Sequence, residues 1–523
     1  MEVRDRPLGH LFFEHMLNRP NAICQIDAAT GKSESNASVL SRSIRLARCL
    51  RQFGAKPGDV LALNGKNHLD LHIPYYAALL NGMPIVGVDP MLKFEEIKKL
   101  FKLTTPKIAF CQCEHFTEAV AELGLDTRIV TFTDGKYSME NFVREFDEKD
   151  RKEFRPAEFD VDKTYLWLIS TGGTTGVLKV AAYKQGPWMM RILAQRKSRL
   201  FNDTEKNLPA LYLSPVQWIA GFYNAIMMPL LNLCKVQTSL PLTADHIIDI
   251  IREYRPVSTV IGPSLLQSIL KHEKQCDLTS FNLILVAGGK VHKDLISELR
   301  VLTRLQKRVR KDAMAAEIYG QTETLGQVFS IEPNGPLGSC GKSTEFHHVK
   351  LMDPDTEKEI TRPNRPGELW VKGPMFTEYY NNPQETAAVF TEDGWFKTGD
   401  LLYRDREYNF YFVERLGMLI KYRNYHITPL ELVEVIRQHP EVLDVSVTSV
   451  KNVFDGEHPV ACVVRRPGSK VTAHEIKELV ANKLSYSKRL RGGVIFMEKL
   501  PRTSTGKVAR AKLKQIAAIA YRE

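Results

Sequence analysis

The sequence predicts an α/β protein whose large N-terminal part is built on doubly wound parallel sheets and whose C-terminal part is a small α+β domain. Two observations carry this prediction. Short apolar runs alternate with segments of helical periodicity as far as residue 319, and short alternating strands with Pro/Gly/Asn turns follow beyond residue 330. A chain of 523 residues also exceeds what one hydrophobic core usually supports, so more than one domain is expected.

The N-terminal part gives a regular alternation of elements. Helices are predicted at 37–53, 72–80 and 93–103. Strands are predicted at 60–63, 84–88, 107–111, 165–169, 210–213, 257–261, 283–287 and 316–319. Because strands that alternate with helices favour parallel pairing through crossover helices, this part is expected to form doubly wound sheets.

The C-terminal part has a different texture. Short strands at 348–351 and 368–371 indicate a small antiparallel barrel or sheet; the β-barrel is the form assigned here. Helices are then predicted at 429–439 and 473–484, and strands at 442–448 and 459–464, enough for an α+β domain of roughly a hundred residues. We therefore expect an N-terminal domain 1–413 and a mobile C-terminal domain 414–523.

The composition is that of a soluble globular protein, with 43% hydrophobic and 25% charged residues. The net charge of +11 favours anionic partners. The one dense basic run, 304–311, is expected to be the solvated face of a helix. It has no interleaved aromatic motif, so no nucleic-acid partner is predicted. No apolar stretch reaches the length that spans a bilayer, and stable membrane insertion is not expected.

The eight cysteines have no disulfide spacing, which fits a reducing compartment. Cys111, Cys113 and His115 are close in sequence, but no second ligand pair accompanies them, so a metal site there is not favoured. The N-terminus lacks an apolar signal core and the C-terminus is not Ser-Lys-Leu. A cytoplasmic protein is expected, with peroxisomal import by another route left open.

A glycine- and hydroxyl-rich segment, Ser170–Lys179, follows the strand 165–169. It holds three glycines, four hydroxyls and one lysine in ten residues, a combination that suits a polyphosphate because backbone N–H groups, hydroxyls and an ammonium all donate. It is neither GxxxxGK[ST] nor GxGxxG. The segment taken alone is equally compatible with a polar loop between a strand and a helix.

Further motifs settle the interpretation. Together with the loop they resemble, in order, the adenylate-forming superfamily of acyl-CoA synthetases, 4-coumarate:CoA ligases and beetle luciferases. The resemblance covers essentially the whole chain and rests on the loop 171–179, Tyr319-Gly320-Gln321-Thr322-Glu323, Gly367-Glu368-Leu369-Trp370-Val371-Lys372-Gly373, Gly394-Trp395-Phe396-Lys397-Thr398-Gly399-Asp400, Glu414-Arg415-Leu416 with Lys421, and Leu500-Pro501-Arg502-Thr503-Ser504-Thr505-Gly506-Lys507.

The resemblance implies a two-step ligase that uses ATP, Mg²⁺ and coenzyme A. A carboxylate attacks the α-phosphorus of ATP to give an acyl-adenylate and pyrophosphate, and a thiol then displaces AMP. The implied substrate is a small-molecule carboxylic acid, either a medium-chain fatty acid or an aryl-substituted one. A luciferase-type monooxygenase that uses the same adenylate and a non-catalytic ligand-binding relative are the alternatives.

The resemblance also implies a role for individual residues. The implied catalytic residues are Lys507, Thr322, Glu323 and Lys421, and Glu323 is also the implied Mg²⁺ ligand. The implied nucleotide-binding residues are Thr171, Gly173, Thr174, Thr175, Gly176, Lys179, Gly288, Gly289, Tyr319, Gly320, Asp400 and Arg415. The implied acid pocket comprises Gln217, Trp218, Gly221 and Tyr223, and the implied hinge is Glu414.

Each role has a simpler alternative. Asp400 could satisfy a turn, Tyr319 could be a core aromatic at a strand end, and Glu323 could cap the start of a helix. Lys507 could be a surface lysine, although its Thr-Gly-Lys setting favours the role of bridging the carboxylate and the α-phosphate.

Several positions depart from the family pattern. Leu178 and Val180 stand where relatives carry Pro and Gly around the loop lysine, and Val180 cannot take a positive φ as glycine can. Gln217 and Trp218 replace a histidine pair, so a reshaped and narrowed acid pocket is expected. The usual linker lysine after Arg-Leu is Gly417.

Overall fold

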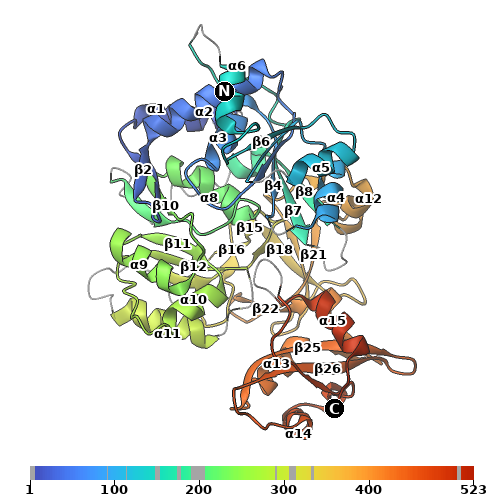
Figure 1. The fold of residues 1–523 in the computed structure, drawn as a ribbon. Helices are drawn as coiled ribbons and strands as arrows, with labels where there is room; N and C mark the ends of the chain where they lie inside the picture. The colour runs from blue at the N-terminus through green and yellow to red at the C-terminus, as the bar shows by residue number, and fades with distance from the viewer. Residues whose placement is uncertain are drawn as a thin grey trace. The chain divides into compact units, whose positions relative to one another are not determined.

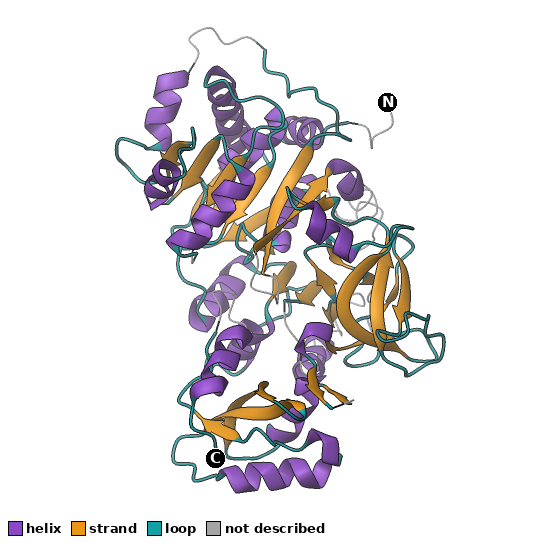
Figure 2. Ribbon diagram, turned by 90° about the vertical axis from the view of Figure 1, so that its right-hand side faces the viewer, coloured by secondary structure: helices purple, strands orange, loops and turns teal. Residues whose placement is uncertain are grey.

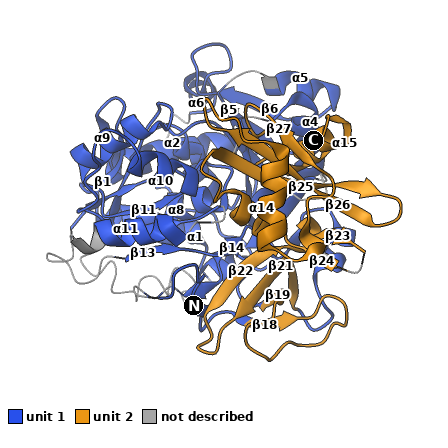
Figure 3. Ribbon diagram, turned by 90° about the horizontal axis from the view of Figure 1, so that it is seen from below, with its two compact units in different colours: residues 1–173, 177–348, 372–394 blue, residues 174–176, 349–371, 395–523 orange. Residues whose placement is uncertain are grey.

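The computed structural model describes residues 6–90, 92–112, 115–147, 153–172, 178–189, 206–288, 291, 293–305, 314–330, 332, 335–423, 425–502 and 508–523. The chain divides into two compact units (Figure 3). Unit 1 comprises residues 1–173, 177–348 and 372–394, and unit 2 comprises residues 174–176, 349–371 and 395–523. The domain boundary expected at residue 414 stays a prediction, since unit 2 joins the strands on both sides of that position.

Unit 1 contains two seven-stranded sheets, and parallel strands predominate in both (Figures 1 and 2). The first has the order β20 (Glu378–Tyr379), β8 (Leu178–Lys184), β7 (Tyr165–Gly172), β4 (Ile85–Val88), β3 (Leu61–Asn64), β5 (Ile108–Cys111) and β6 (Arg128–Thr131). The second has the order β13 (Met314–Glu317), β12 (Leu283–Val286), β11 (Ser258–Ile261), β9 (Leu208–Leu211), β10 (Leu233–Gln237), β1 (Ile23–Asp27) and β2 (Lys32–Ser35).

Helices cover these sheets through apolar faces. In the first sheet, α4 (Phe94–Thr104) and α5 (His115–Glu122) share a buried cluster with β3, β4 and β5. In the second sheet, α9 (Ala244–Tyr254), α10 (Pro263–Leu270) and α11 (Lys293–Leu305) share a cluster with β9, β10, β11 and β12. The apolar spacing on these helices explains their position, because a stripe at every third or fourth residue faces one side of the helix.

Two further helices are covered on more than one side. Every residue of α3 (His72–Asn81) is buried, and α1 (Leu8–Asn18) and α2 (Asn36–Gln52) pack against it. Helix α8 (Ile219–Leu230) packs against β10 of the second sheet, while its Phe222 lies 5.9 Å from Trp167 of β7 in the first. Helix α8 therefore bridges the two sheets of unit 1, and its hydrophobic sequence reflects burial on several faces.

Two segments add short strand pairs to unit 1. Between β13 and unit 2, β14 (Gly320–Gln321) pairs with β15 (Gly326–Gln327), and β16 (Phe329–Ser330) pairs with β17 (Lys342–Ser343). In the returning segment 372–394, β20 pairs with β8 and is followed by α12 (Pro383–Val389). Among the described residues, unit 1 also contains α6 (Met139–Phe146).

Unit 2 contains two sheets. A four-stranded antiparallel sheet has the order β18 (His348–Met352), β19 (Gly367–Lys372), β21 (Phe396–Arg404) and β22 (Phe410–Arg415). The second sheet consists of β24 (Tyr425–Ile427), β23 (Ile420–Tyr422), β26 (Gly456–Arg465) and β25 (Val442–Asn452), with β27 (Val494–Phe496) paired to β26. Helices α13 (Pro429–Ile436), α14 (Ala473–Lys483) and α15 (Arg510–Ile519) pack on it, and η3 (Leu416–Met418) and η4 (Tyr486–Lys488) are single 3₁₀ turns.

The observed elements confirm the predicted architecture, for example the helix expected at 72–80, which spans His72–Asn81. The strands expected as a small barrel or sheet pair, as far as they are described, in the order β18-β19-β21-β22. Two local expectations were wrong. The Gly/Thr segment joins two antiparallel strands, β7 and β8, and not a strand and a helix. Val180 lies within β8 opposite Ser170, where the extended backbone makes the lost glycine inconsequential.

Other sequence features can be placed only in part. Helix α11 is described as far as Leu305, and the rest of the basic run, residues 306–311, lies outside the described residues, as does Cys113. Across the described ranges, His, Cys, Asp and Glu side chains form no group of three that could hold a metal ion. In the same ranges, no helix combines the length and the apolar character needed to cross a membrane.

Candidate active site

The Gly/Thr loop is held at both ends by the β7–β8 pair. Thr171 lies opposite Lys179 in the antiparallel register, and Gly172 opposite Leu178 is the last pair before the loop. The other predicted loop residues, Gly173, Thr174, Thr175 and Gly176, lie outside the described residues. The hairpin therefore fixes the position of Lys179 at the exit of the loop.

Lys179 is held by a carboxylate and an aromatic ring. Its ammonium forms an ion pair with Glu385 of α12 and lies 5.1 Å from the centre of the Tyr379 ring. Only 13% of the Lys179 side chain is exposed. Because both partners lie on the β20–α12 segment, the pairing of β20 with β8 aligns them with Lys179.

Tyr379 also reaches the second predicted motif. Its hydroxyl donates a hydrogen bond of 2.9 Å to Oε1 of Glu323, while its ring faces Lys179. One buried tyrosine thus connects the lysine of the Gly/Thr loop with the predicted Mg²⁺ carboxylate, two residues 144 positions apart in sequence.

Glu323 lies in the tight turn between β14 and β15. The Thr324 hydroxyl accepts a hydrogen bond from the backbone N–H of Gln321 at 3.0 Å, and Leu325 has a φ of 57°. A Cβ on Gly320 would lie 1.7 Å from the carbonyl oxygen of Gly326, so this position in the hairpin requires glycine. No helix begins here, and the helix-capping alternative for Glu323 was wrong.

The turn is anchored to the neighbouring strands. The hydroxyl of Tyr183 in β8 donates to the carbonyl of Thr322, and the backbone N–H of Phe376 donates to the carbonyl of Glu323 at 2.8 Å. These bonds place Thr322 and Glu323 beside β8, the strand that carries Lys179. Tyr183, Tyr379 and Glu385 were missed in the sequence because they belong to none of the motifs considered; only the pairing of β20 with β8 reveals their role.

Glu323 has the chemistry of a Mg²⁺ ligand. Its side chain is 91% buried, and Tyr379 compensates one carboxylate oxygen with a hydrogen bond. Mg²⁺ prefers hard oxygen ligands and binds proteins through one or two carboxylates together with substrate phosphates and waters. A single held carboxylate beside a phosphate-type loop fits that mode of binding, which needs no cage of several acidic residues.

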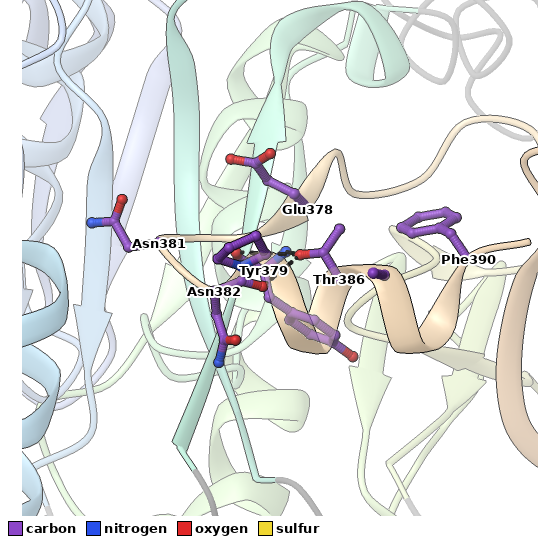
Figure 4. A pocket seen from close by; sticks show the side chains of 8 residues that line it. Glu378, Tyr379, Asn381, Asn382, Thr386 and Phe390 are labelled. Carbon is purple, nitrogen blue, oxygen red and sulfur yellow. Dashed lines mark hydrogen bonds between the residues drawn. The ribbon is translucent and has the colours of Figure 1, made fainter. Parts of the chain in front are cut away.

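A shallow pocket of about 440 Å³ opens beside Tyr379 (Figure 4). The hydroxyl of Thr386 accepts a hydrogen bond of 3.0 Å from the backbone N–H of Tyr379, which fixes the start of α12 against β20. The pocket contains none of the residues that the sequence predicted; it is lined by Glu378, Tyr379, Asn381, Asn382, Pro383, Thr386, Ala387 and Phe390.

Tyr319 and Gly288 follow the carboxyl ends of adjacent parallel strands. Strand β12 pairs with β13, and the N–H of Ile318 continues the pairing to the carbonyl of Val286 at 3.0 Å. Ligands of open α/β sheets bind outside this edge. Gly288 has a φ of 88° and open space around its missing Cβ, while Gly289 lies outside the described residues.

The ring of Tyr319 is 93% buried and lies 5.6 Å from that of Phe329. It is therefore a packed aromatic at a strand end, the simpler of its two interpretations. The adenine-stacking role stays a prediction, because the position at the carboxyl edge suits both.

In unit 2, Asp400 and Arg415 form a cross-strand pair. They lie opposite each other in β21 and β22, and Arg415 Nε is 2.9 Å from Asp400 Oδ1. Asp400 is 98% buried, whereas 41% of the Arg415 side chain is exposed. The arginine thus neutralises a carboxylate that would be costly to bury alone. Asp400 is a strand residue, so the idea that it merely satisfies a turn was wrong.

The neighbours of Asp400 hold its backbone. The Thr398 hydroxyl donates to the carbonyl of Leu369 at 2.7 Å and accepts from the N–H of Asp400 at 3.1 Å. The N–H of Gly399 donates to Glu368 Oε1 at 3.0 Å. The Gly-Glu-Leu-Trp and Thr-Gly-Asp motifs are therefore adjacent strands that support one carboxylate.

The remaining predicted residues of the C-terminal region differ in burial. Glu414 is 98% buried, with Arg510 of α15 at 3.4 Å. Lys421 is exposed on β23, and its backbone N–H donates to Glu457 at 3.1 Å. Lys507 lies outside the described residues. The hinge role of Glu414 and the catalytic roles of both lysines stay predictions.

The residues predicted to line the acid pocket lie at the start of α8. Gln217 is 91% buried, and the half-buried Trp218 is the N-cap of the helix. A Cβ on Gly221 would lie 2.1 Å from the carbonyl oxygen of Pro215, so glycine lets the turn close on the preceding segment. Tyr223 stacks on Trp188, with ring centres 5.0 Å apart. Gln217 and Trp218 thus precede the helix, and Gly221 and Tyr223 lie near its start.

Family models match both parts of the chain. The model described as "AMP-binding enzyme" matches residues 12–380, well over half of the sequence, and that described as "AMP-binding enzyme C-terminal domain" matches residues 431–507. The chain belongs to the AMP-binding enzymes. The fold of the family is accordingly confirmed, and the protein is an enzyme of the adenylate-forming class.

Relatives extend over nearly all of the chain. A luciferin 4-monooxygenase of Photuris pensylvanica is 30% identical over 94% of this chain and 92% of its own length. A 4-coumarate-CoA ligase 1 of Narcissus pseudonarcissus is 26% identical over 97% of this chain and 93% of its own. The ATP-bound structure of MatB from Rhodopseudomonas palustris has a TM-score of 0.84, with 22% identity over 97% of this chain and 98% of that one, and shows the shared fold.

Proposed function

We propose that this AMP-binding enzyme is an ATP-dependent acid:CoA ligase. It would convert a medium-chain fatty or aryl-substituted carboxylic acid to an acyl-adenylate and then to an acyl-CoA thioester. The observation that carries the proposal is the Tyr379 contact. Tyr379 contacts both Lys179, at a phosphate-type loop, and the buried carboxylate of Glu323. A lysine and a carboxylate that would hold Mg²⁺ are the groups that neutralise charge on a nucleoside triphosphate.

The residues of unit 1 suit the first half-reaction. Lys179 and the backbone of the Gly/Thr loop would bind phosphate oxygens, and Thr322 would donate to the α-phosphate. Glu323 would hold Mg²⁺, which when bound neutralises charge on the phosphates. The pairing of Lys179 with Glu385 keeps the ammonium in place before ATP arrives, so less reorganisation is needed on binding.

The residues of unit 2 would bind the nucleoside and supply the catalytic lysines. Asp400 would accept hydrogen bonds from the ribose hydroxyls, and Arg415 would orient its carboxylate. Lys507 would bridge the acid and the α-phosphate in the first step, and Lys421 would serve the thioester step. Glu414 would be the pivot between the two arrangements, the kind of closure that also protects an adenylate from water.

The decisive experiment is a pyrophosphate-release screen. The protein is incubated with ATP, Mg²⁺ and acids of increasing chain length or with aryl substituents, and AMP and thioester are then measured with coenzyme A added. Acid-dependent pyrophosphate followed by acyl-CoA supports the ligase. Light emission with a luciferin in the absence of coenzyme A would favour the monooxygenase that the Photuris relative suggests. Nucleotide binding without turnover on any acid would indicate a non-catalytic relative.

Lys507→Ala tests the catalytic assignment. We expect it to lower acid-dependent pyrophosphate release by on the order of 10²- to 10³-fold, because it removes a charge that acts on the developing anion. It should still form thioester from supplied acyl-adenylate and coenzyme A. Lys512→Ala, a change at an exposed lysine of α15, is the control. Normal adenylation by the Lys507 variant would refute the assignment.

A further inference from the structure

Three tyrosine hydroxyls bind backbone carbonyls of α8. Tyr212 donates to Gly221 at 2.9 Å, Tyr75 to Phe222 at 2.9 Å, and Tyr76 to Ala225 at 2.8 Å. All three tyrosines are at least 99% buried. Tyr75 and Tyr76 come from α3, and Tyr212 follows β9, so the helix is clamped from two directions.

The bond from Tyr76 has a structural explanation. Helix α8 contains Pro229, which lacks the N–H that would bond the carbonyl four residues earlier, that of Ala225. The Tyr76 hydroxyl supplies the missing donor. No proline explains the bond at Gly221, because the residue four positions later is Ala225, which has an N–H. The Tyr212 bond is thus an addition to the normal helix pattern.

Tyr212 ends a chain of buried polar groups. Lys235 Nζ lies 3.0 Å from His72 Nδ1, and His72 Nε2 lies 3.2 Å from the Tyr212 hydroxyl. His72 is fully buried and Lys235 is 99% buried. The contacts of the Lys235 ammonium in the described structure are with neutral groups: besides His72, its Nζ lies 5.4 Å from the centre of the Tyr212 ring. A buried charge held by neutral partners is costly to keep in the interior.

The charge states fix the direction of the hydrogen bonds. Burial lowers the pKa of Lys235 to about 8 and holds that of His72 well below 6.5, so near pH 7 the lysine is charged and the histidine neutral. An ammonium only donates, and therefore His72 Nδ1 must accept. His72 Nε2 then carries the proton and donates to Tyr212, whose own proton is left for Gly221.

We propose that Tyr212, oriented by His72 and Lys235, is a positioning residue that fixes the first turn of α8 and with it the acid pocket. Gly221 lies in that turn between Trp218 and Tyr223, and the turn is already closed against Pro215. A small rotation of the turn therefore moves the groups expected to contact the acid. This inference rests on the proposed function, in which these residues line the acid pocket.

Tyr212→Phe is the test, and Tyr76→Phe is its matched control. Each substitution removes one buried hydrogen bond to α8, and of these two tyrosines only Tyr212 bonds a carbonyl of the first turn. We expect Tyr212→Phe to raise the KM for the acid by about tenfold and to leave the KM for ATP within about twofold, as loss of one buried hydrogen bond allows. Tyr76→Phe should leave the KM for the acid unchanged, although it lowers the melting temperature.

Lys235→Met and the double variant Tyr212→Phe/Lys235→Met extend the test. Since Lys235 acts through the Tyr212 hydroxyl, the double variant should show no higher KM for the acid than Tyr212→Phe alone. If the factors by which Tyr212→Phe and Lys235→Met raise the KM for the acid multiply in the double variant, the proposal is overturned. An equal rise in the KM values for acid and ATP in Tyr212→Phe would also overturn it. An effect of Tyr76→Phe on the acid as large as that of Tyr212→Phe would do the same.

Hydrogen exchange separates this inference from the proposed function. Tyr212→Phe should increase deuterium uptake in peptides that cover residues 217–224, and Tyr76→Phe in peptides that cover residues 225–231. Unchanged uptake in 217–224 would refute the clamp even in an active ligase. If no acid is turned over, the ligase proposal fails, and the exchange measurement still decides whether Tyr212 holds the turn.

Discussion

Replacing Lys235 by methionine should change how the stability of the protein depends on pH. Burial lowers the pKa of this lysine from 10.5 to about 8. Between these values the unfolded chain binds a proton that the folded chain has already released. Because stability rises with pH wherever the unfolded state binds more protons, Lys235 makes the wild type more stable as the pH rises through this window. Below about pH 8 the penalty for its buried charge is fully present.

The magnitude follows from the size of the shift. One pKa unit corresponds to about 1.4 kcal/mol, so the shift from 10.5 to about 8 represents roughly 3 kcal/mol over the full window. Methionine has a similar volume and no titrating group. The unfolding free energy of the wild type minus that of Lys235→Met should therefore rise by about 3 kcal/mol from pH 8 to pH 10.5.

Urea unfolding followed by tryptophan fluorescence between pH 7 and pH 10.5 measures this difference. Buried tyrosines such as Tyr75 and Tyr76, whose pKa values are raised, add the same pH dependence to the stability of the wild type and of the variant, so their contribution cancels in the subtraction. Lys32→Met, a change at an exposed lysine on strand β2 of the same sheet, is the control and should give a flat difference curve. A flat curve for Lys235→Met as well would refute a buried lysine with a lowered pKa.

Two further predictions concern the catalytic residues. Tyr379→Phe keeps the ring over Lys179 but removes the hydrogen bond to Glu323. The Mg²⁺ concentration for half-maximal pyrophosphate release should therefore rise about tenfold in this variant and stay unchanged in the control Tyr380→Phe. Equal Mg²⁺ dependence in both variants would contradict the role of Tyr379. Asp400→Asn keeps the shape of the side chain and removes its charge, so nucleotide affinity measured by calorimetry should fall at least tenfold, and undiminished binding would exclude the ribose role.

The sequence determined the order and type of the elements. The nearly continuous apolar run at 72–80 located α3 within one residue, because a helix that is buried on all sides is apolar all round. Ordered motifs were enough for the family, because residues such as Glu323 and Asp400 lie in local patterns that the chemistry constrains. Local patterns gave the wrong element after the Gly/Thr loop, where strand pairing decides the secondary structure. The segment β8 is a strand because β7 and β20 lie on either side of it.

Only the tertiary structure revealed the partners that hold these residues. Tyr379 lies far along the chain from both Lys179 and Glu323, and it contacts them because β20 pairs with β8. Lys235, His72 and Tyr212 likewise come from three separate parts of the chain and share no motif. Hydrogen bonds and burial act between groups that are close in space, and the distance along the chain carries no record of them.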